Sequence, residues 1–221
     1  FFGYLMRNYE DTMEISKDFN EKFEKFDEVL EYIHKNYNKV TLDDLSEKFK
    51  FNKVYRDEIR NELDISDDKY IIGHVGRFSE EKNHDFFIKL AKKLNEKYVF
   101  LLIGEGPIKD EFKMKINNEN LDSKFRILDG TKLIYKYYSA MDVFMMPSFN
   151  EGLPIVSVEA QCNGLHCIFS DTISDETNIS GKCKYLPLNS VDEWVTTLES
   201  QDYTRFDGVK VIKNAGFDME N

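Results

Sequence analysis

From about residue 64 onward, short apolar runs alternate with segments in which apolar residues recur every three or four positions. Runs of three to six mainly apolar residues, bounded by Gly, Pro or polar residues, are typical of buried parallel strands. The intervening segments have the period of a helix with one buried face. The predicted strands cover residues 70–75, 98–103, 125–128, 143–146, 165–169 and 184–186, and the predicted helices cover residues 85–96, 108–117, 133–140, 154–162 and 191–198. This alternation predicts an α/β fold with a parallel sheet and helices on both faces.

Residues 9–38 show a different pattern, rich in Glu, Lys and Phe and without Gly or Pro. Apolar residues recur there at steps of three and four, which predicts one long helix with an apolar face. A second, shorter helix is expected from Thr41, a favourable N-cap residue, to Phe49. We therefore divide the chain into a helical segment, residues 1–50, and an α/β domain, residues 51–221.

Composition and charge narrow the choice of partners. The chain has 221 residues, 41% of them hydrophobic, which is enough for a packed core. Its formal net charge at pH 7 is −11. An acidic balance disfavours nucleic acid or an anionic membrane surface as the main partner.

Cysteine usage and hydropathy indicate the compartment. The three Cys residues are odd in number and form no CxxC pair, which disfavours a disulfide framework or a zinc site. No apolar run approaches the roughly 18 residues of a membrane span, and the apolar start lacks the basic residues of a signal peptide. We therefore expect a cytoplasmic protein without a transmembrane segment.

Two pairs of residues follow the first two predicted strands. Arg77 and Lys82 lie in the loop after the first of them, and Gly104 and Gly106 follow the second. Two cations that converge beside a helix start can clamp a diphosphate, and small residues let a ligand approach the backbone. Because ligands of parallel sheets bind beyond the carboxyl ends of the strands, both pairs are candidate binding residues. Each pattern alone is equally typical of a solvated loop or a tight turn.

Residues 145–163 combine a strand end, a polar turn and the start of a helical pattern. Two carboxylates, Glu151 and Glu159, stand eight positions apart around Pro154. If the helix reaches back to Glu151, eight positions make a little over two turns, and both side chains lie on roughly one side. A helix start suits an anion, so carboxylates beside it are expected to bind hydroxyl groups. The alternative is two ordinary solvated Glu side chains.

Taken together and in this order, these segments resemble the C-terminal, nucleotide-sugar-binding domain of family 4 retaining glycosyltransferases of the capsular and exopolysaccharide type. The motifs that carry the resemblance are GHVGRFSEEKNHDFFI, LLIGEGP and SAMDVFMMPSFNEGLPIVSVEAQCNG, and it covers residues 49–218. The E-x7-E signature of the family falls on Glu151 and Glu159. The implied fold is the C-terminal half of a GT-B fold, in which two Rossmann-like domains face each other across a cleft.

The resemblance also implies a reaction and roles for the side chains. Such enzymes transfer a hexose from a nucleoside diphosphate sugar to a hydroxyl acceptor with retention of configuration. Arg77 and Lys82 would hold the donor diphosphate and stabilise the charge that grows on it as the glycosidic bond breaks. Glu151 would hydrogen-bond hydroxyls of the transferred sugar, and Glu159 would bind the ribose hydroxyls. The implied catalytic residues are Arg77, Lys82 and Glu151.

Other residues are implied to contact the donor through their backbone. Gly76, Gly152 and Leu153 would lie beside the sugar and phosphates, with Gly104 and Gly106 under the nucleoside. Enzymes of this family need no metal or other cofactor. In accord with this, the sequence contains no Asp-x-Asp, and its four His residues show no ligand spacing.

Departures from the family pattern limit these expectations. The turn after the third predicted strand reads Leu128-Asp129-Gly130-Thr131, where the family has a Leu-Gly pair followed by polar residues near the base, so the base is left open. An acceptor-binding domain is not recognisable before residue 64, and the family continues into a long helix where this chain stops. We expect a glycan or lipid-linked acceptor to need that further domain. This chain alone is therefore expected to bind donor with little or no turnover.

Residues 26–51, FDEVLEYIHKNYNKVTLDDLSEKFKF, resemble the first half of the helix-turn-helix domain of AraC-type regulators. In that family the next helix enters the major groove, but here that position carries Asp57 and Glu58, and the second helix-turn-helix unit is absent. We expect a helical appendage without DNA binding. Two alternatives stay open: a DNA-binding regulator fragment, and a non-functional mosaic that exposes an apolar face and associates.

Overall fold

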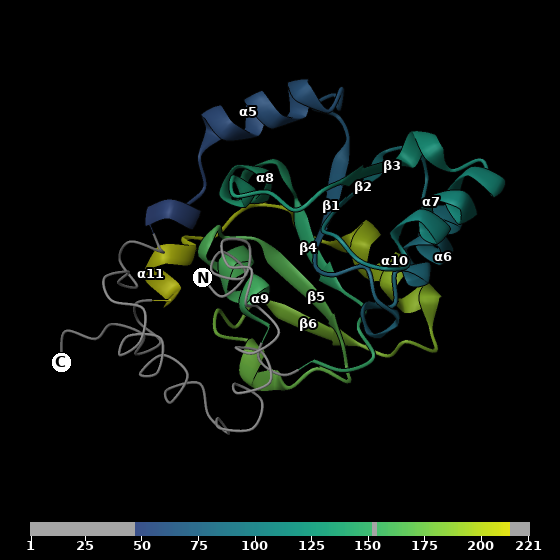
Figure 1. Ribbon diagram of the computed structural model, residues 1–221. Coiled ribbons are helices and arrows are strands. Elements are labelled where there is room, and N and C mark those ends of the chain that lie inside the picture. The colour runs from purple at the N-terminus through teal and green to yellow at the C-terminus, as the bar shows by residue number, and fades with distance from the viewer. Residues whose placement is uncertain (1–46, 152–153, 213–221) are drawn as a thin grey trace.

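The computed structural model describes residues 47–151 and 154–212, which form a parallel sheet covered by helices on both faces (Figure 1). The sheet has the strand order β3-β2-β1-β4-β5-β6, and all neighbouring strands are parallel. Its strands are β1 (Tyr70–Val75), β2 (Tyr98–Ile103), β3 (Phe125–Leu128), β4 (Val143–Met146), β5 (His166–Ser170) and β6 (Cys183–Leu186). This is the Rossmann-like α/β fold that the sequence predicts.

The helices form two layers, with α5, α8, α9 and α11 on one face of the sheet and α6, α7 and α10 on the other (Figure 1). Their bounds are α5 (Lys53–Glu62), α6 (Asp85–Lys93), α7 (Lys109–Asn118), α8 (Ile134–Ala140), α9 (Ile155–Cys162), α10 (Val191–Ser200) and α11 (Gly208–Ile212), and the short 3-10 helices are η1 (Glu80–Lys82), η2 (Asp122–Lys124) and η3 (Asp175–Thr177). In the described ranges, none of the helices combines the length and apolar character needed to cross a membrane.

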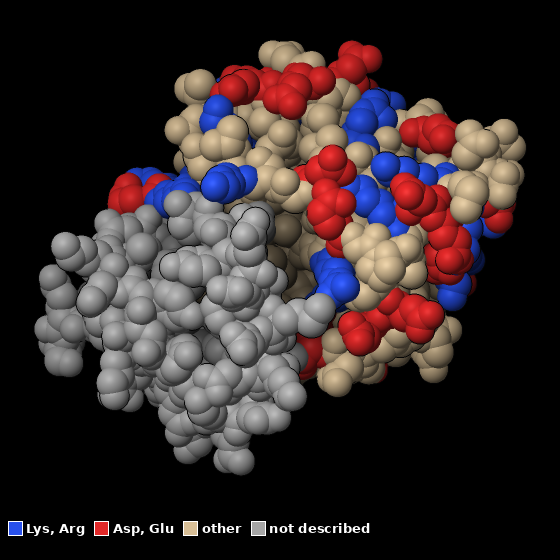
Figure 2. Space-filling model, viewed as in Figure 1, with Lys and Arg blue, Asp and Glu red and all other residues tan. Residues whose placement is uncertain are grey.

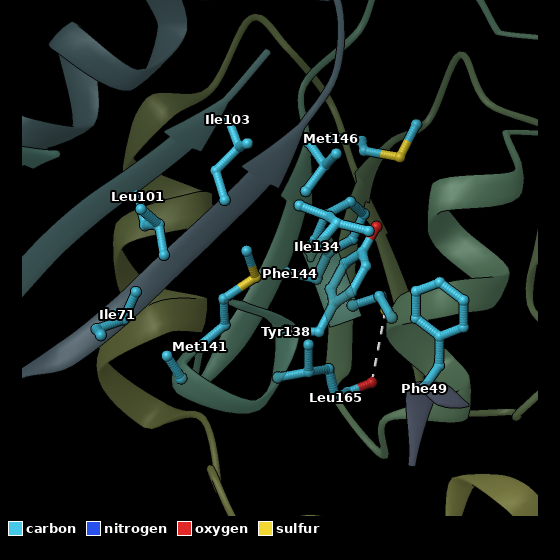
Figure 3. Close-up of a cluster of buried hydrophobic side chains, with 14 of the residues drawn as sticks. Phe49, Ile71, Leu101, Ile103, Ile134, Tyr138, Met141, Phe144, Met146 and Leu165 are labelled. Atoms are coloured by element: carbon cyan, nitrogen blue, oxygen red, sulfur yellow. Dashed lines mark hydrogen bonds between the residues drawn. The ribbon is translucent and has the colours of Figure 1, made fainter. Parts of the chain in front are cut away.

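The two layers divide the core in two, because consecutive strand residues point to opposite faces of a sheet. Ile71 and Leu101 belong to the cluster under α5, α8 and α9 (Figure 3), whereas Ile72 and Leu102 belong to the cluster under α6, α7 and α10. With both faces covered, all of β2 is buried. The central strands are therefore continuously apolar rather than alternating.

Most predicted strand boundaries are confirmed, at residues 70–75, 98–103, 125–128 and 143–146. β5 lies one residue later than predicted, and β6 starts one residue earlier, at Cys183. Helix α6 ends at Lys93 instead of residue 96, because Leu94 adopts an extended conformation and buries its side chain. The sequence pattern at helix ends is weaker than within the elements, since frayed turns and caps carry few apolar residues.

The predicted helical hairpin lies outside the described residues up to residue 46, and so does most of the stretch that resembles an AraC-type domain. Helix α5, which occupies the place of the recognition helix in that comparison, packs against α8 instead. The part of this stretch that the structure describes is therefore built into the α/β domain.

The charges of α5 are arranged for that packing. Its arginines point inward, with Arg56 Nη2 2.7 Å and Arg60 Nη1 3.3 Å from the carboxylate of Asp142. Its outer side carries acidic groups (Figure 2), and Asp57 and Glu58 are both exposed. Asp57 lies 2.6 Å from Lys53 Nζ and Glu58 lies 2.9 Å from Lys136 Nζ, so both exposed acidic groups form ion pairs within the domain.

Candidate functional site

The candidate site lies at the carboxyl edge of the sheet, where the strand order reverses. The chain adds β2 and then β3 on one side of β1. It then crosses back and adds β4, β5 and β6 on the other side of β1. Ligands of open α/β sheets bind in the crevice outside such a switch point. The turns that follow β1 and β4 meet there, at residues 76–84 and 147–151.

Lys82 and Glu151 form an ion pair between these two turns. Lys82 Nζ lies 2.5 Å from Oε1 and 2.6 Å from Oε2 of Glu151. Ser148 Oγ donates a further hydrogen bond to Glu151 Oε1 at 2.7 Å. The side chains of Lys82 and Glu151 are 23% and 9% exposed, so the pair is partly shielded from water but open on one side. The structure thus brings together two of the three predicted catalytic residues, which lie 69 positions apart in the sequence.

The turn that carries Glu151 is held on its β1 side by two hydrogen bonds. Phe149 N donates to Glu81 O at 2.8 Å, and Asn83 Nδ2 donates to Pro147 O at 3.0 Å. Both bonds join this turn to the loop that carries Lys82. The two loops are therefore tied together through their backbones as well as through the ion pair.

The same turn is held on its β5 side through the carbonyl of Ser148. Ser170 Oγ donates to Ser148 O at 2.5 Å, and Thr172 Oγ1 donates to it at 2.9 Å. Together with the contacts on the β1 side, these bonds support the turn from both neighbouring strands. They fix where the Glu151 carboxylate lies, which is the kind of support that a binding group needs.

Glycines let the turns after β1 and β2 touch. A Cβ atom on Gly104 would lie 1.9 Å from Gly76 O, and one on Gly106 would lie 2.2 Å from Phe78 O. Both distances are far below van der Waals contact, and the neighbouring atoms are backbone, so a side chain at either position would force the turns apart. The predicted Gly-x-Gly turn therefore contacts the loop after β1 directly, as a shared ligand site requires.

The site offers two cations to an anion. The side chain of Arg77 is exposed and makes no hydrogen bond or ion pair with any other described residue. Lys82 is paired with Glu151. An incoming anion would have to take the place of the Glu151 carboxylate as the acceptor of the Lys82 hydrogen bonds. Among residues 47–151 and 154–212, no group of three or more His, Cys, Asp or Glu side chains is arranged to hold a metal ion.

Glu159 lies deeper than the other predicted residues. It is on α9, is 2% exposed, and accepts a 2.7 Å hydrogen bond from the hydroxyl of buried Tyr138 on Oε2. Helix α9 begins at Ile155, with Pro154 as an extended N-cap residue, so the helix does not reach back to Glu151. The condition for a shared helix face is therefore not met, because Glu151 belongs to the preceding turn. The predicted helix start at Pro154 agrees with the structure to within one residue.

Two further predicted contact residues, Gly152 and Leu153, follow Glu151 directly. They lie outside the described residues, between the turn after β4 and the start of α9. Their backbone contacts with a donor therefore stay a prediction.

Two buried histidines pack together near the candidate site, His74 on β1 and His84 at the end of the loop after β1. His74 Nδ1 lies 2.9 Å from Met145 O and must carry the proton, while Nε2 has no partner among the described residues. A Cβ on Gly76 would meet that Nε2 at 2.9 Å. The ring of His84 meets the ring of His74 at 87°, with their centres 5.1 Å apart. Burial, helped by His84 and Lys82, lowers the pKa of His74 well below 6.5, so this histidine is neutral at pH 7.

The protein should lose stability on acidification through His84. Burial lowers the pKa of His84 from 6.5 to about 4, with the Ser79 backbone opposing the effect and the Lys82 charge adding to it. Between these two pH values the unfolded chain binds a proton that the folded protein refuses, so the free energy of unfolding falls as the pH falls, by up to about 3 kcal/mol. Urea unfolding from pH 7 to 4 should show a shallower loss for His84→Gln than for wild type. Equal slopes for the two proteins would contradict this role of His84.

Sequence reasoning missed three side chains that support the site: Ser148, Tyr138 and Lys109. Ser148 and Tyr138 hydrogen-bond Glu151 and Glu159, and Lys109 Nζ lies 2.8 Å from the first carbonyl of the Gly-x-Gly turn. A usable signal exists for Ser148 and Lys109, because both lie within five positions of a predicted site residue. Tyr138 has no such signal, since it is 21 positions from Glu159 and the packing of α8 on α9 brings them together.

The chain is similar in sequence to known glycosyltransferases. The family model "Glycosyl transferases group 1" matches residues 55–195. The chain is 39% identical over 157 residues to the putative glycosyltransferase EpsF of Bacillus subtilis (strain 168), covering 69% of this chain and 41% of that protein. It is 28% identical over 144 residues to the UDP-Gal:alpha-D-GlcNAc-diphosphoundecaprenol alpha-1,3-galactosyltransferase of Escherichia coli, covering 62% of this chain and 37% of that protein. The chain thus spans less than half the length of these curated relatives.

Solved structures with the same fold are also similar to this chain. Anabaena Alr3699/HepE in complex with UDP superposes with a TM-score of 0.65 at 17% identity, covering 81% of this chain and 51% of that one. The C-terminal domain of the glycosyl transferase group 1 protein LpcC from Francisella tularensis superposes with a TM-score of 0.60 at 20% identity, covering 80% of this chain and 97% of that domain. The fold of the described residues is that of one domain of GT-B glycosyltransferases.

Proposed function

This chain belongs to the glycosyl transferases group 1 family, and on that premise we propose that it binds a nucleoside diphosphate sugar. In the proposed reaction, the hexose of this donor is transferred to a hydroxyl acceptor with retention of configuration. The observation that carries the proposal is the pairing of Lys82 with Glu151 at the switch point of the sheet, with Arg77 in the same loop as Lys82. A cation and a carboxylate held in one place match the two chemical halves of the donor. The diphosphate needs positive charge, and the sugar hydroxyls need hydrogen-bond acceptors.

In the proposed complex, the diphosphate binds between Arg77 and Lys82 and displaces Glu151 from Lys82 Nζ. Glu151 then accepts hydrogen bonds from hydroxyls of the hexose, at the end of the donor where the glycosidic bond breaks. Negative charge grows on the leaving diphosphate in the transition state, and the two cations stabilise it there more than in the ground state. They supply this charge stabilisation without a metal ion or other cofactor. Retention follows if a phosphate oxygen of the donor takes the acceptor proton on the face that the diphosphate leaves.

The nucleoside occupies the turns after β2 and β3 in this proposal. Gly104 and Gly106 lie under it, Glu159 binds the ribose hydroxyls, and Gly76, Gly152 and Leu153 offer backbone contacts. Glu159 is held by Tyr138, so its carboxylate has a defined orientation. These residues support the proposal that the donor is a nucleoside diphosphate hexose, and the identity of its base is left open.

The acceptor is proposed to be a glycan or a lipid-linked sugar in the synthesis of a surface polysaccharide. The Escherichia coli relative is named for a diphosphoundecaprenol-linked acceptor and a UDP-Gal donor, and two other relatives are named for the biosynthesis of amylovoran and of teichuronic acid. We place the reaction in the cytoplasm, because three Cys residues without a CxxC pair are typical of a protein from a reducing compartment.

Calorimetric titration of the chain with UDP, GDP and their hexose conjugates tests the proposal. At least one nucleoside diphosphate should bind in the micromolar to millimolar range, which is ordinary for a donor site. Arg77→Ala should weaken that binding, whereas Lys97→Ala, an exposed lysine at the opposite edge of the sheet, should leave it unchanged. Failure of every nucleotide to bind would sink the proposal. A turnover assay with the same donors shows whether this chain alone transfers the sugar.

A further inference from the structure

Lys109 is a buried lysine at the start of α7 whose ammonium group joins two turns of the site. It is 6% exposed. Its Nζ lies 2.8 Å from Gly104 O, 3.1 Å from Leu128 O and 2.5 Å from Asp129 Oδ1, with Glu105 Oε2 at 3.5 Å. Two of these acceptors belong to the turn after β2, and the other two are on the last residue of β3 and the first residue after it. All three protons of the ammonium group therefore have partners at the carboxyl edge of the sheet.

These two turns are linked to each other and to the loop after β1. Gly104 N donates to Leu128 O at 3.1 Å, so the carbonyl that Lys109 holds is also the contact between the turns. Phe78 N donates to Glu105 O at 2.8 Å, and Lys109 Nζ lies 5.6 Å from the centre of the Phe78 ring. Lys109 thus sits behind the place where the turns after β1, β2 and β3 converge.

The counter-charges of Lys109 face the solvent. The side chains of Glu105 and Asp129 are both exposed, and Glu105 Oε1 also accepts a hydrogen bond from Gly130 N at 3.3 Å. The hydrogen bond from Lys109 holds the pKa of Asp129 below its usual value, so this carboxylate stays ionised. Without Lys109, these two carboxylates would be left without their shared cation, Gly104 O would lose this donor, and Leu128 O would keep only the hydrogen bond from Gly104 N.

We propose that Lys109 is a positioning residue for the donor, which fixes the turns after β2 and β3 in the arrangement that receives the nucleoside. The inference rests on the proposed function, because it assumes that a nucleoside diphosphate binds at this edge. Lys109 acts through the turns and does not itself touch the ligand, since its donors are all used by the protein. It also provides the cation for Asp129, the residue at which this chain departs from the family pattern.

Lys124 offers a matched control at the opposite end of the sheet. It is 8% exposed, and its Nζ donates to Leu94 O at 2.6 Å and Ala91 O at 3.1 Å, with Glu96 Oε1 at 3.1 Å. Like Lys109, it is a buried lysine that holds two backbone carbonyls and a carboxylate. It precedes β3, whereas Lys109 contacts the carboxyl end of β3. Lys124→Met should therefore lower stability without changing the nucleotide site.

The test compares Lys109→Met, Lys124→Met and the double variant Lys109→Met with Asp129→Asn, which restores the charge balance. Calorimetry measures binding of UDP and GDP, and thermal melting measures stability. Lys109→Met should bind the nucleotide at least about tenfold more weakly than wild type, because buried hydrogen bonds from a charged donor are lost. The double variant should stay as weak. The affinity of Lys109→Met for pyrophosphate, which lacks the nucleoside, should remain within about twofold of wild type.

Four outcomes would overturn the inference while leaving the proposed function intact, and a fifth would overturn both. Nucleotide binding by Lys109→Met within about twofold of wild type would show that the lysine is not needed. Recovery in the double variant would show that Lys109 acts only as a counter-charge, and an equal loss for Lys124→Met would show a general effect of stability. A parallel loss of pyrophosphate binding would place the effect on the diphosphate. If wild type binds no nucleotide, the proposed function fails first and this inference fails with it.

Discussion

Replacing Lys82 with alanine is expected to weaken the binding of a nucleoside diphosphate sugar by about ten- to a hundredfold, because a charge-assisted contact to the diphosphate is lost. The residue lies at the end of η1, and its Nζ reaches across the switch point to the turn after β4. The truncation also releases Glu151, which would then present an unpaired carboxylate to the incoming diphosphate. Both consequences weaken the binding of the nucleoside diphosphate sugar.

Replacing Glu151 with glutamine should have the opposite effect on the free nucleotide. In this structure both carboxylate oxygens of Glu151 contact Lys82 Nζ, at 2.5 and 2.6 Å. The glutamine side chain would have the same shape but no charge, so the diphosphate would no longer compete with a carboxylate for the ammonium group. We expect UDP or GDP alone to bind several-fold more tightly to Glu151→Gln, while the nucleotide sugar loses its advantage over the free nucleotide.

Calorimetry with the nucleotide and the nucleotide sugar, on wild type and both variants, measures these effects. Lys92→Ala is the matched control, because Lys92 forms an equally short ion pair, 2.6 Å from Glu119, on the exposed surface of α6. It should leave both affinities unchanged. The proposal that the diphosphate displaces Glu151 from Lys82 would be refuted if Glu151→Gln bound the free nucleotide more weakly than wild type.

Replacing Asp142 with alanine is expected to lower the free energy of unfolding by about 3–5 kcal/mol, the cost of breaking a buried ion pair by removing one partner. Asp142 Oδ2 accepts a 2.7 Å hydrogen bond from Ile71 N, at the start of β1, and lies 3.3 Å from Arg60 Nη1. Its other oxygen lies 2.7 Å from Arg56 Nη2. The variant leaves the buried guanidinium of Arg60 without this carboxylate and Ile71 N without an acceptor. Burial already lowers the pKa of Arg60, with the nearby Arg56 adding to the effect.

Chemical denaturation of Asp142→Ala beside Asp192→Ala measures this cost. Asp192 forms a 2.6 Å ion pair with Lys93, but both side chains are well exposed. An exposed pair is screened by water, so Asp192→Ala should change stability by less than about 1 kcal/mol. Similar losses for the two variants would contradict the view that the carboxylate of Asp142 anchors α5 to the sheet.

Much of the fold follows from local patterns in the sequence. Residues 98–103 read YVFLLI, and a continuous apolar run of that length, bounded by polar residues, is typical of a strand buried on both faces. Runs of this kind alternate with segments of helical period, and this predicts a parallel sheet with crossover helices. Such signals lie within a few neighbouring residues, so they can be recognised before the chain folds.

The candidate site could be predicted only in part, for a physical reason. The residue types after each strand and the resemblance to a family indicate Arg77, Lys82 and Glu151, since the carboxyl ends of parallel strands share one edge. The sequence leaves open whether one helix carries both carboxylates, and the structure decides it: α9 begins after Pro154, its extended N-cap residue, and Glu151 lies before it. A helix boundary depends on a few backbone dihedral angles that apolar periodicity does not record.

The sequence by itself determined the fold class, the strands and the family, because each depends on residues close together in the chain. Only the tertiary structure decided that Lys82 pairs with Glu151 and that Lys109 holds two carbonyls of neighbouring turns. It also decided that the arginines of α5 face inward to Asp142. These contacts join segments that no local pattern connects, and burial fixes their partners, because a charge removed from water must find its hydrogen bonds within the protein.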